Sequence, residues 1–267
     1  MDATTSGVIP IGWWQLALAT GLMVLTGALS VALGLGVGKK LAIATARTFV
    51  QLLLLGYVLG WVFGLDSPLA VVAILLFMTG MAALTISRRA PDAPRGILGM
   101  SFFSMLLIGM FVTFTVTGVI VGVEPWYLPR YVIPIAGMVL GNSMNGIALA
   151  IERTFADLDA RSGEVLALTA LGATPWEAAG PSIRTALRAG MIPGINTLSA
   201  AGIVFIPGMM AGQILAGTDP LVAAPYQIVV MIMVATADVL GSITTVLLAY
   251  RRRFTADGVF EEPGLRA

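Results

Sequence analysis

The stretch Glu164–Gly190 reads EVLALTALGATPWEAAGPSIRTALRAG and interrupts two strongly apolar parts of the chain with polar and charged residues. Each flanking part is long enough to cross the hydrocarbon core of a bilayer, which takes about 20 apolar residues per helix. We therefore expect residues 152–190 to form a long loop outside the bilayer. Its position between two membrane spans makes it the place where we expect a partner to dock.

The composition is that of an integral membrane protein. Of 267 residues, 58% are hydrophobic and 11% are charged, and the mean hydropathy is +0.94. Soluble domains carry about 25% charged residues. We predict an all-α membrane protein with about seven transmembrane helices in one domain over residues 1–267. The first run is too long for a signal peptide and predicts a retained anchor. The predicted spans are 13–38, 41–64, 68–87, 96–122, 131–151, 191–216 and 222–249.

The distribution of Lys and Arg predicts the orientation of these spans. Cationic loops stay in the cytoplasm during membrane insertion. With seven spans, every Lys and Arg except Arg47 and Arg130 falls in alternate loops or at the C-terminus. The pattern places the N-terminus outside, the C-terminus in the cytoplasm, and the 152–190 loop in the cytoplasm between the fifth and sixth helices.

Several classes of function are excluded by the residue types. The chain has no Cys and no His, so it offers no disulfide, thiolate or imidazole ligand. Gly36, Gly38 and Lys39-Lys40 do not have the spacing of a phosphate-binding P-loop. A net charge of +1 gives no basic face for nucleic acid. We expect no cofactor bound by this chain, and no enzymatic activity of its own.

The long loop carries readable helix signals. Glu164–Leu171 favours a helix, and Gly172 is typical of a helix C-terminal cap. Thr174-Pro175-Trp176-Glu177 is a capping box with Pro at the first helical position. Pro181 is expected to end or kink this short second helix. One interpretation is an amphipathic helix that lies on the inner leaflet, with Trp176 at the interface.

A second interpretation comes from a resemblance. The loop resembles the cytoplasmic coupling loop of ABC-transporter permeases, in which a glycine turn and a short helix fit a groove in the ATPase. Glu164 stands eight residues before Gly172, so the usual Glu-Ala-Ala start of that motif is only partly matched. The resemblance implies a set of ATPase-coupling residues: Glu164, Leu171, Gly172, Ala173, Thr174, Pro175, Trp176 and Glu177.

A wider resemblance extends from the second span to Tyr250. The chain resembles the FetB/YbbM-type ABC transporter permease family. This implies the membrane-spanning subunit of an ATP-driven iron exporter in the bacterial inner membrane, a homodimer paired with separate ATPase subunits that bind ATP and Mg. Plant relatives of that family are linked to aluminium tolerance. The motifs that carry the resemblance are Arg47–Leu52 with Gly56-Tyr57, Val132–Met138 with Gly141-Asn142, Leu171–Pro175, Pro207–Met210, and Asp219-Pro220 with Tyr226–Ile228.

Polar and sulfur-bearing residues within the spans are candidates for a translocation pathway. Each has an ordinary structural alternative: Arg47 could reach lipid phosphates, the amides could bridge helices, and Met commonly fills helix interfaces. Thioether ligands also suit copper(I) better than iron. The candidates are Arg47, Gln51, Asn142, Met144, Asn145, Asn196, Met209, Met210, Gln213 and Asp238.

Asp238 supports an alternative function. It lies in the last predicted span, and its own helix carries no basic residue before Arg251. An ionisable group in hydrocarbon costs several kcal/mol unless it is paired or hydrated, about 3 or more. Asp238 must be protonated, hydrated or paired across helices. The alternative to an ATP-driven permease is a proton-coupled secondary transporter in which Asp238 titrates.

Overall fold

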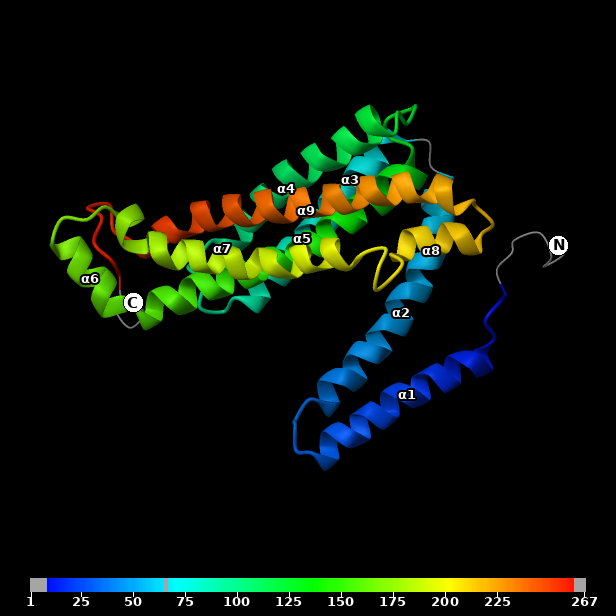
Figure 1. Ribbon diagram of the computed structural model, residues 1–267, viewed down its shortest axis with the longest axis horizontal. Helices are drawn as coiled ribbons and strands as arrows, with labels where there is room; N and C mark the ends of the chain where they lie inside the picture. The colour runs from blue at the N-terminus through cyan, green and yellow to red at the C-terminus, as the bar shows by residue number, and fades with distance from the viewer. Residues whose placement is uncertain (1–8, 65–66, 262–267) are drawn as a thin grey trace. The chain divides into compact units, whose positions relative to one another are not determined.

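The computed structural model describes residues 9–64 and 67–261, and in these ranges the chain is almost entirely helical (Figure 1). Extended backbone pairs there only in two isolated bridges. This confirms the predicted all-α fold. The helices form two compact units. The first contains the described part of Met1–Asp66 together with Gly212–Asp219, and the second contains the rest. A single domain over 1–267 stays a prediction.

The first unit is a helical hairpin of α1 (Trp13–Ala32) and α2 (Gly38–Val62). Gly34 and Gly36 adopt positive φ angles of 65° and 67° in the connecting turn, a conformation that glycine reaches without steric cost. Gly38 lets the two helices approach, since its added Cβ would lie 3.4 Å from Val31. Most apolar side chains of the hairpin are exposed, which suits lipid or another protein.

The second unit is built around α5 (Pro129–Ala160), which packs against α3, α4, α7 and α9. In Figure 1, α7 and α9 run beside α5, and α6 lies at one end of this bundle. We call this end the α6 end. The other elements are α3 (Pro68–Arg89), α4 (Ile97–Phe114) with a π-helical turn (Thr115–Ile120), α6 (Ser162–Ala170), α7 (Pro175–Ala200), α9 (Pro220–Tyr250) and a 3₁₀ turn (Arg251–Arg253); α8 (Gly208–Leu215) straddles the division between the units.

Six helices of the described chain are long and apolar enough to cross a membrane. They correspond to six of the seven predicted spans, and their bounds differ from the predicted ones mainly at the ends. α5 extends to Ala160, nine residues past the predicted limit at 151. The chain is therefore a multi-pass helical membrane protein, whereas the count of seven spans and the orientation stay predictions.

The predicted sixth span at 191–216 is not one continuous helix. α7 ends at Ala200, and α8 begins only at Gly208. Between them, Gly202 has a φ of 79° and its N–H donates to Phe205 O, which forms a tight turn. Pro207 then directly precedes α8, where its missing N–H removes no helical hydrogen bond. The predicted sixth span is therefore interrupted at residues 201–207, between α7 and α8.

Pro181 does not end the loop helix, so that alternative is wrong, whereas a kink at Pro181 stays a prediction. α7 runs without interruption from Pro175 through Pro181 and Pro193 to Ala200. An interior proline removes one helical hydrogen bond, at a cost of about 3 kcal/mol. Packing compensates, because Ala178, Ala179 and Ile183 are completely buried. The loop helix and the first part of the predicted sixth span are therefore one element.

The largest hydrophobic core lies toward the α6 end. It includes Ile151, Phe155 and Leu158 of α5, with Ile183 of α7 and Val246 of α9. A smaller core joins α4, α5 and α9 around Val139 and Met233. The larger core contains more completely buried side chains than the smaller one, so the α6 end of the bundle is tightly packed.

Tight helix crossings in the second unit occur at glycines that the small-residue spacings did not predict. A Cβ at Gly190 of α7 would lie 2.9 Å from Ala150 Cβ and 3.0 Å from Gly146 O on α5. Gly241 of α9 approaches Ile147 in the same way. The sequence also contains Gly-x-x-x-Gly spacings at 56/60, 137/141 and 208/212, a pattern that favours close helix packing in membranes. Of these six glycines, only Gly137 has a described neighbour within 4 Å of an added Cβ, namely Met78.

We expect Gly190→Ala to destabilise the protein. An Ala in a helix normally gains about 0.5–1 kcal/mol over Gly, but overpacking of a rigid contact costs about 1–3 kcal/mol. The expected net loss of about 1–2 kcal/mol is measured by denaturation in detergent. Gly99→Ala in α4 is the matched control, because no atom lies within 4 Å of its added Cβ. Equal stability of the two variants would contradict the crossing.

Candidate functional site

A cavity of about 640 Å³ lies among α5, α7 and α9 in the second unit. Its volume is in the range of small-molecule sites, about 300–1,000 Å³. Apolar side chains form most of the wall, and the polar groups are few. The polar lining residues are Asn142, Asn145, Thr197, Gln227 and Asp238.

Asp238 is the one charged residue among the lining residues of this cavity. It is 7% exposed, and its Oδ1 atom has no hydrogen-bond partner. The carboxylate lies directly against two glycines: a Cβ at Gly146 of α5 would be 2.6 Å from the Asp238 carboxyl carbon, and one at Gly194 of α7 would be 3.1 Å from Oδ2. α5 and α7 therefore approach this carboxylate of α9 closely, and each does so at a glycine, which has no side chain.

Asn145 connects the cavity wall to α3. Arg89, the last residue of α3, donates a hydrogen bond to Asn145 Oδ1, and the Asn145 amide donates to Gly141 O at 3.2 Å. Gly146, which lies against Asp238, follows Asn145 directly. Asp238 itself lies near the middle of α9 (Pro220–Tyr250).

Two further lining residues, Asn142 and Gln227, have side-chain amide oxygens that can still accept a hydrogen bond. Asn142 uses its NH₂ group to donate to Met138 O at 2.7 Å, so its side-chain oxygen stays available. Gln227 of α9 is 7% exposed, and its Oε1 accepts from Met210 N–H at 3.2 Å. A carbonyl oxygen has two lone pairs and so retains one after this bond. The cavity therefore combines a carboxylate with amide oxygens.

The structure brings only some of the predicted pathway residues together. Asn142, Asn145, Met209 and Asp238 line the cavity, and Met210 contacts its wall through Gln227. The others lie elsewhere: Met144 packs against the large core, Asn196 is exposed on α7, Arg47 and Gln51 are exposed on α2 in the first unit, and Gln213 belongs to the first unit. Their assignment to a pathway stays a prediction.

Sequence reasoning missed the residues that shape the cavity. Gly146, Gly190 and Gly194 are lining residues, and none was a candidate. The sequence did show a carboxylate in an apolar helix and glycines in two other helices, which together could have indicated a close approach of those helices to the carboxylate. Gln227 was quoted within a family motif but was not assigned to the site. Its amide became informative only once the fold placed it opposite α5.

The turn between α6 and α7 and the first residues of α7 have the predicted local geometry, and we call this segment, residues 171–177, the connector. Gly172 has a φ of 93°, and Ala173 N–H donates to Leu168 O. Thr174 caps α7, since Glu177 N–H donates to Thr174 Oγ1 at 3.3 Å and the Glu177 carboxylate accepts from Thr174 N–H at 2.8 Å. These bonds hold the pKa of Glu177 below its ordinary value. Leu171 is 86% exposed at the tip of the turn.

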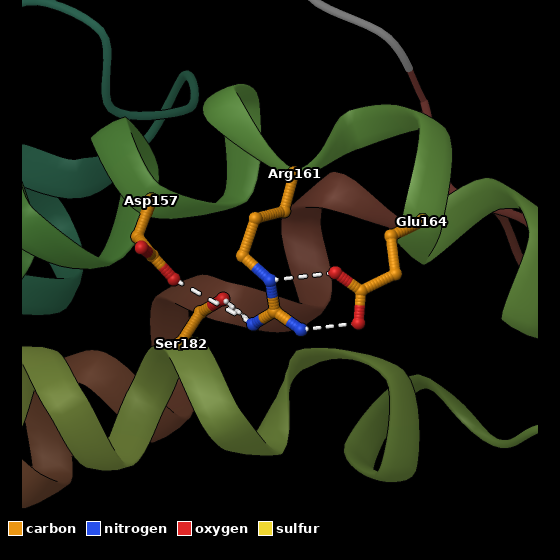
Figure 2. Close-up of polar contacts among 4 residues, drawn as sticks. All are labelled: Asp157, Arg161, Glu164 and Ser182. Carbon is orange, nitrogen blue, oxygen red and sulfur yellow. Dashed lines mark hydrogen bonds and ion pairs between the residues drawn. The ribbon is translucent and has the colours of Figure 1, made fainter.

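Arg161 fastens α6 to α7 (Figure 2). Its guanidinium donates two hydrogen bonds to Glu164, at 2.9 and 2.6 Å, and one to Ser182 Oγ of α7 at 3.0 Å. Asp157 of α5 lies 3.7 Å from the same group. The Arg161 hydrogen bond lowers the pKa of Glu164, and the Glu164 hydrogen bond raises that of Arg161. Glu164, predicted as a coupling residue, thus has a structural partner.

The C-terminal segment supports the connector from another side. Trp176 packs edge-on against Tyr250 with ring centroids 6.0 Å apart, and Pro175 lies 3.5 Å from an added Cβ at Gly258. Arg253 is 2% exposed and binds both the Asp159 carboxylate at 2.8 Å and Asp92 O at 3.2 Å. The start of α7 therefore rests on a structured surface and still leaves Trp176 43% exposed.

One helix joins the connector to the cavity. α7 begins at Pro175 beside the exposed turn, and residues 190, 193, 194, 197 and 198 in its second half line the cavity. Its 26 residues give a length of about 39 Å at 1.5 Å per residue. A single continuous helix thus connects the connector to the cavity wall.

Comparison with known proteins places the chain in a family. The model of an uncharacterised protein family, UPF0014, matches residues 13–254, which include the cavity, the connector and the first unit. The chain belongs to the UPF0014 family. No solved structure matches this UPF0014 member significantly.

Relatives of this UPF0014 member match over nearly their whole length. The UPF0014 membrane protein slr1647 of Synechocystis is 35% identical over 92% of this chain and 95% of that protein. The Arabidopsis protein ALUMINUM SENSITIVE 3 is 33% identical over 90% of this chain and 86% of that protein. The Escherichia coli protein named probable iron export permease protein FetB is 32% identical over 91% of this chain and 92% of that protein. The resemblance to the FetB-type family is thereby confirmed.

Proposed function

We propose that this UPF0014 member is the membrane-spanning permease subunit of an ABC transporter, which exports iron or another metal with energy from ATP hydrolysed by a separate subunit. The proposal draws its substrate from the relative named as a probable iron export permease. The chain itself is expected to bind neither ATP nor Mg, which belong to the partner ATPase.

The connector is the observation that carries this proposal. It presents an exposed Leu171 and a half-exposed Trp176 on a turn fixed by Gly172, the capping box and Arg161. A lipid-binding helix needs a long apolar face, but the buried face of α7 packs against α5 instead. A short rigid protrusion at the end of a long helix suits a groove in a protein partner better than a leaflet surface.

In the proposed mechanism, the ATPase subunits bind the connector on the cytoplasmic side of the bacterial inner membrane. Movement of the connector shifts α7 along α5, where Gly190 allows close contact. The second half of α7 then alters the access to the cavity. The break at residues 201–207 gives α7 freedom to move without carrying α8 with it.

We further propose that two copies of the chain form the transporter together with two ATPase subunits. One copy supplies one cavity of about 640 Å³ and a large amount of exposed apolar surface on α1 and α2. Exposed faces of this extent suit lipid or a second copy of the chain. The proposed transporter is thus a homodimer of permeases in the membrane.

A proton-coupled secondary transporter is the second candidate, and the position of Asp238 favours it. A buried carboxylate with an unpartnered oxygen next to a cavity is the feature that such a transporter needs. This candidate requires transport without any ATPase. It also leaves the exposed connector without a role.

The proposed function is tested by reconstituting the chain in nanodiscs with a candidate ABC ATPase subunit from the same organism. We expect a stable complex and faster ATP hydrolysis than by the ATPase alone. The control omits the chain from the nanodisc. Absence of both the complex and the stimulation would contradict the ABC assignment, and metal transport by the chain alone would establish the second candidate.

A further inference from the structure

We propose that Asp238 is a cation-binding carboxylate that holds a proton while the cavity is empty and exchanges it for a divalent cation. This proposal rests on one part of the proposed function, namely that the transported substrate is a metal cation. It does not depend on which subunit supplies the energy.

First, in the empty cavity, the surroundings of Asp238 favour a protonated carboxyl group. Asp238 is more than nine-tenths buried, and Oδ1 accepts no hydrogen bond from any described residue. Gly146 and Gly194, which lie against the carboxylate, present no polar side chain to it. An ionised carboxylate without donors is strongly unfavourable at a buried position, whereas the protonated form is neutral. The empty cavity therefore favours the proton.

The second step is the charge around the site. Among the described residues, Asp238 is the single charged residue that lines the cavity. α4 and the rest of α9 contain no charged residue within their bounds. On α5 and α7, the nearest charged residues toward the α6 end, Glu152 and Arg188, lie six positions from the glycines that touch Asp238. Arg89 of α3 is engaged by Asn145. Within the described part of the chain, no basic side chain pairs with the carboxylate, which leaves that role to a ligand.

The third step is the chemistry of the ligand set. Divalent cations of the Mg, Ca and Mn type bind carboxylate, amide and water oxygens. The cavity offers the Asp238 carboxylate, and the Asn142 amide lines it about one helical turn along α5 from Gly146. In the described residues no three His, Cys, Asp or Glu side chains come together. The site therefore binds a partly hydrated cation weakly, as a transported ion requires.

The exchange balances in charge and atoms. The protonated Asp238 carboxyl loses its proton to cavity water, and one carboxylate oxygen forms a bond to the entering cation. One proton leaves for each cation that binds, so the charge in the cavity rises by one unit instead of two. Departure of the cation and return of a proton restore the empty state. This lowers the cost of admitting a divalent ion to an apolar surrounding.

The test measures Mn²⁺ binding to the purified full-length chain in nanodiscs, together with the protons released in a weakly buffered solution. We expect up to one proton released per Mn²⁺ bound, and affinity that falls about tenfold per pH unit where the carboxyl is protonated. Asp238→Asn keeps the side-chain shape. It should weaken binding at least about tenfold and abolish both the proton release and the pH dependence.

Two further variants separate the carboxylate from general effects. Gly146→Ala leaves the charge in place but places a methyl group where the carboxylate lies, so binding should fall as in Asp238→Asn. Glu152→Gln removes an exposed carboxylate of α5 outside the cavity and should bind Mn²⁺ as the wild type does.

The proposal is overturned if Asp238→Asn binds Mn²⁺ with the affinity and proton release of the wild type, or if the wild type binds no Mn²⁺. Because no ATPase is present, these outcomes are independent of the proposed ABC role. Loss of ATPase stimulation with intact Mn²⁺ binding would remove that role and leave the Asp238 site standing.

Discussion

The double variant Trp176→Ala/Glu177→Ala is expected to lose the stimulation of ATP hydrolysis by the permease. Trp176 is the exposed aromatic of the connector, and Glu177 closes the capping box with Thr174. Coupling between two sites is typically worth about 1–3 kcal/mol, so stimulation should fall roughly 5- to 150-fold. The measurement is the rate of ATP hydrolysis by the partner ATPase, with and without each form of the permease in nanodiscs.

The chain offers a matched control for this variant. Glu124→Ala/Trp126→Ala changes the same two residue types in the loop before α5, at the end opposite the α6 end. Trp126 is 46% exposed, close to the 43% of Trp176. We expect stimulation close to that of the wild type. If both double variants lower stimulation equally, the connector has no special role. Gel filtration of each variant excludes unfolding, since loss of one helix cap costs only about 1 kcal/mol.

Arg253→Met should give the largest loss of stability among single substitutions at the α6 end. Arg253 is 2% exposed, pairs with Asp159 at 2.8 Å, donates to Asp92 O and lies 5.5 Å from the centre of the Phe155 ring. Loss of a hydrogen bond to a charged group costs about 1.5–3 kcal/mol, and the substitution also removes the bond to Asp92 O and the contact with Phe155. Methionine keeps most of the side-chain volume, so the lost charge dominates the effect.

Denaturation in detergent measures this loss. Arg95→Met is the control, because Arg95 lies in the same α3–α4 loop as Asp92 and is exposed. A substitution of that kind usually changes stability by less than about 0.5 kcal/mol. If Arg253→Met is as stable as Arg95→Met, the C-terminal segment does not anchor the α6 end.

The membrane class and most helices follow from the sequence, because a bilayer imposes a simple length requirement on apolar runs. The connector could also be predicted in detail. Gly172, Thr174 and Glu177 act through local hydrogen bonds within one or two turns of helix, and such bonds need no knowledge of the rest of the fold.

The path of α7 could not be predicted in the same way. Pro181 is a strong local signal for a helix break, but burial of Ala178, Ala179 and Ile183 against neighbouring helices overrides it. Conversely, the apolar stretch 191–216 reads as one span, whereas the turn at Gly202 divides it. Both errors arise where tertiary packing or a single positive φ angle outweighs hydropathy.

The cavity required the fold itself. Asp238 stood out in the sequence as an ionisable residue in an apolar helix, but its neighbours did not. Gly146 and Gly194 carry no chemistry of their own and matter only because α5 and α7 bring them against the carboxylate. Met144 illustrates the opposite case, since it resembles a metal ligand but packs against the hydrophobic core.

The most direct test of the central claim is ATP-dependent iron movement across liposomes that contain the chain and its partner ATPase. The account predicts iron transport that requires ATP, fails with Trp176→Ala/Glu177→Ala, and persists with Glu124→Ala/Trp126→Ala. Iron movement at the same rate without ATP or without the ATPase would contradict the account.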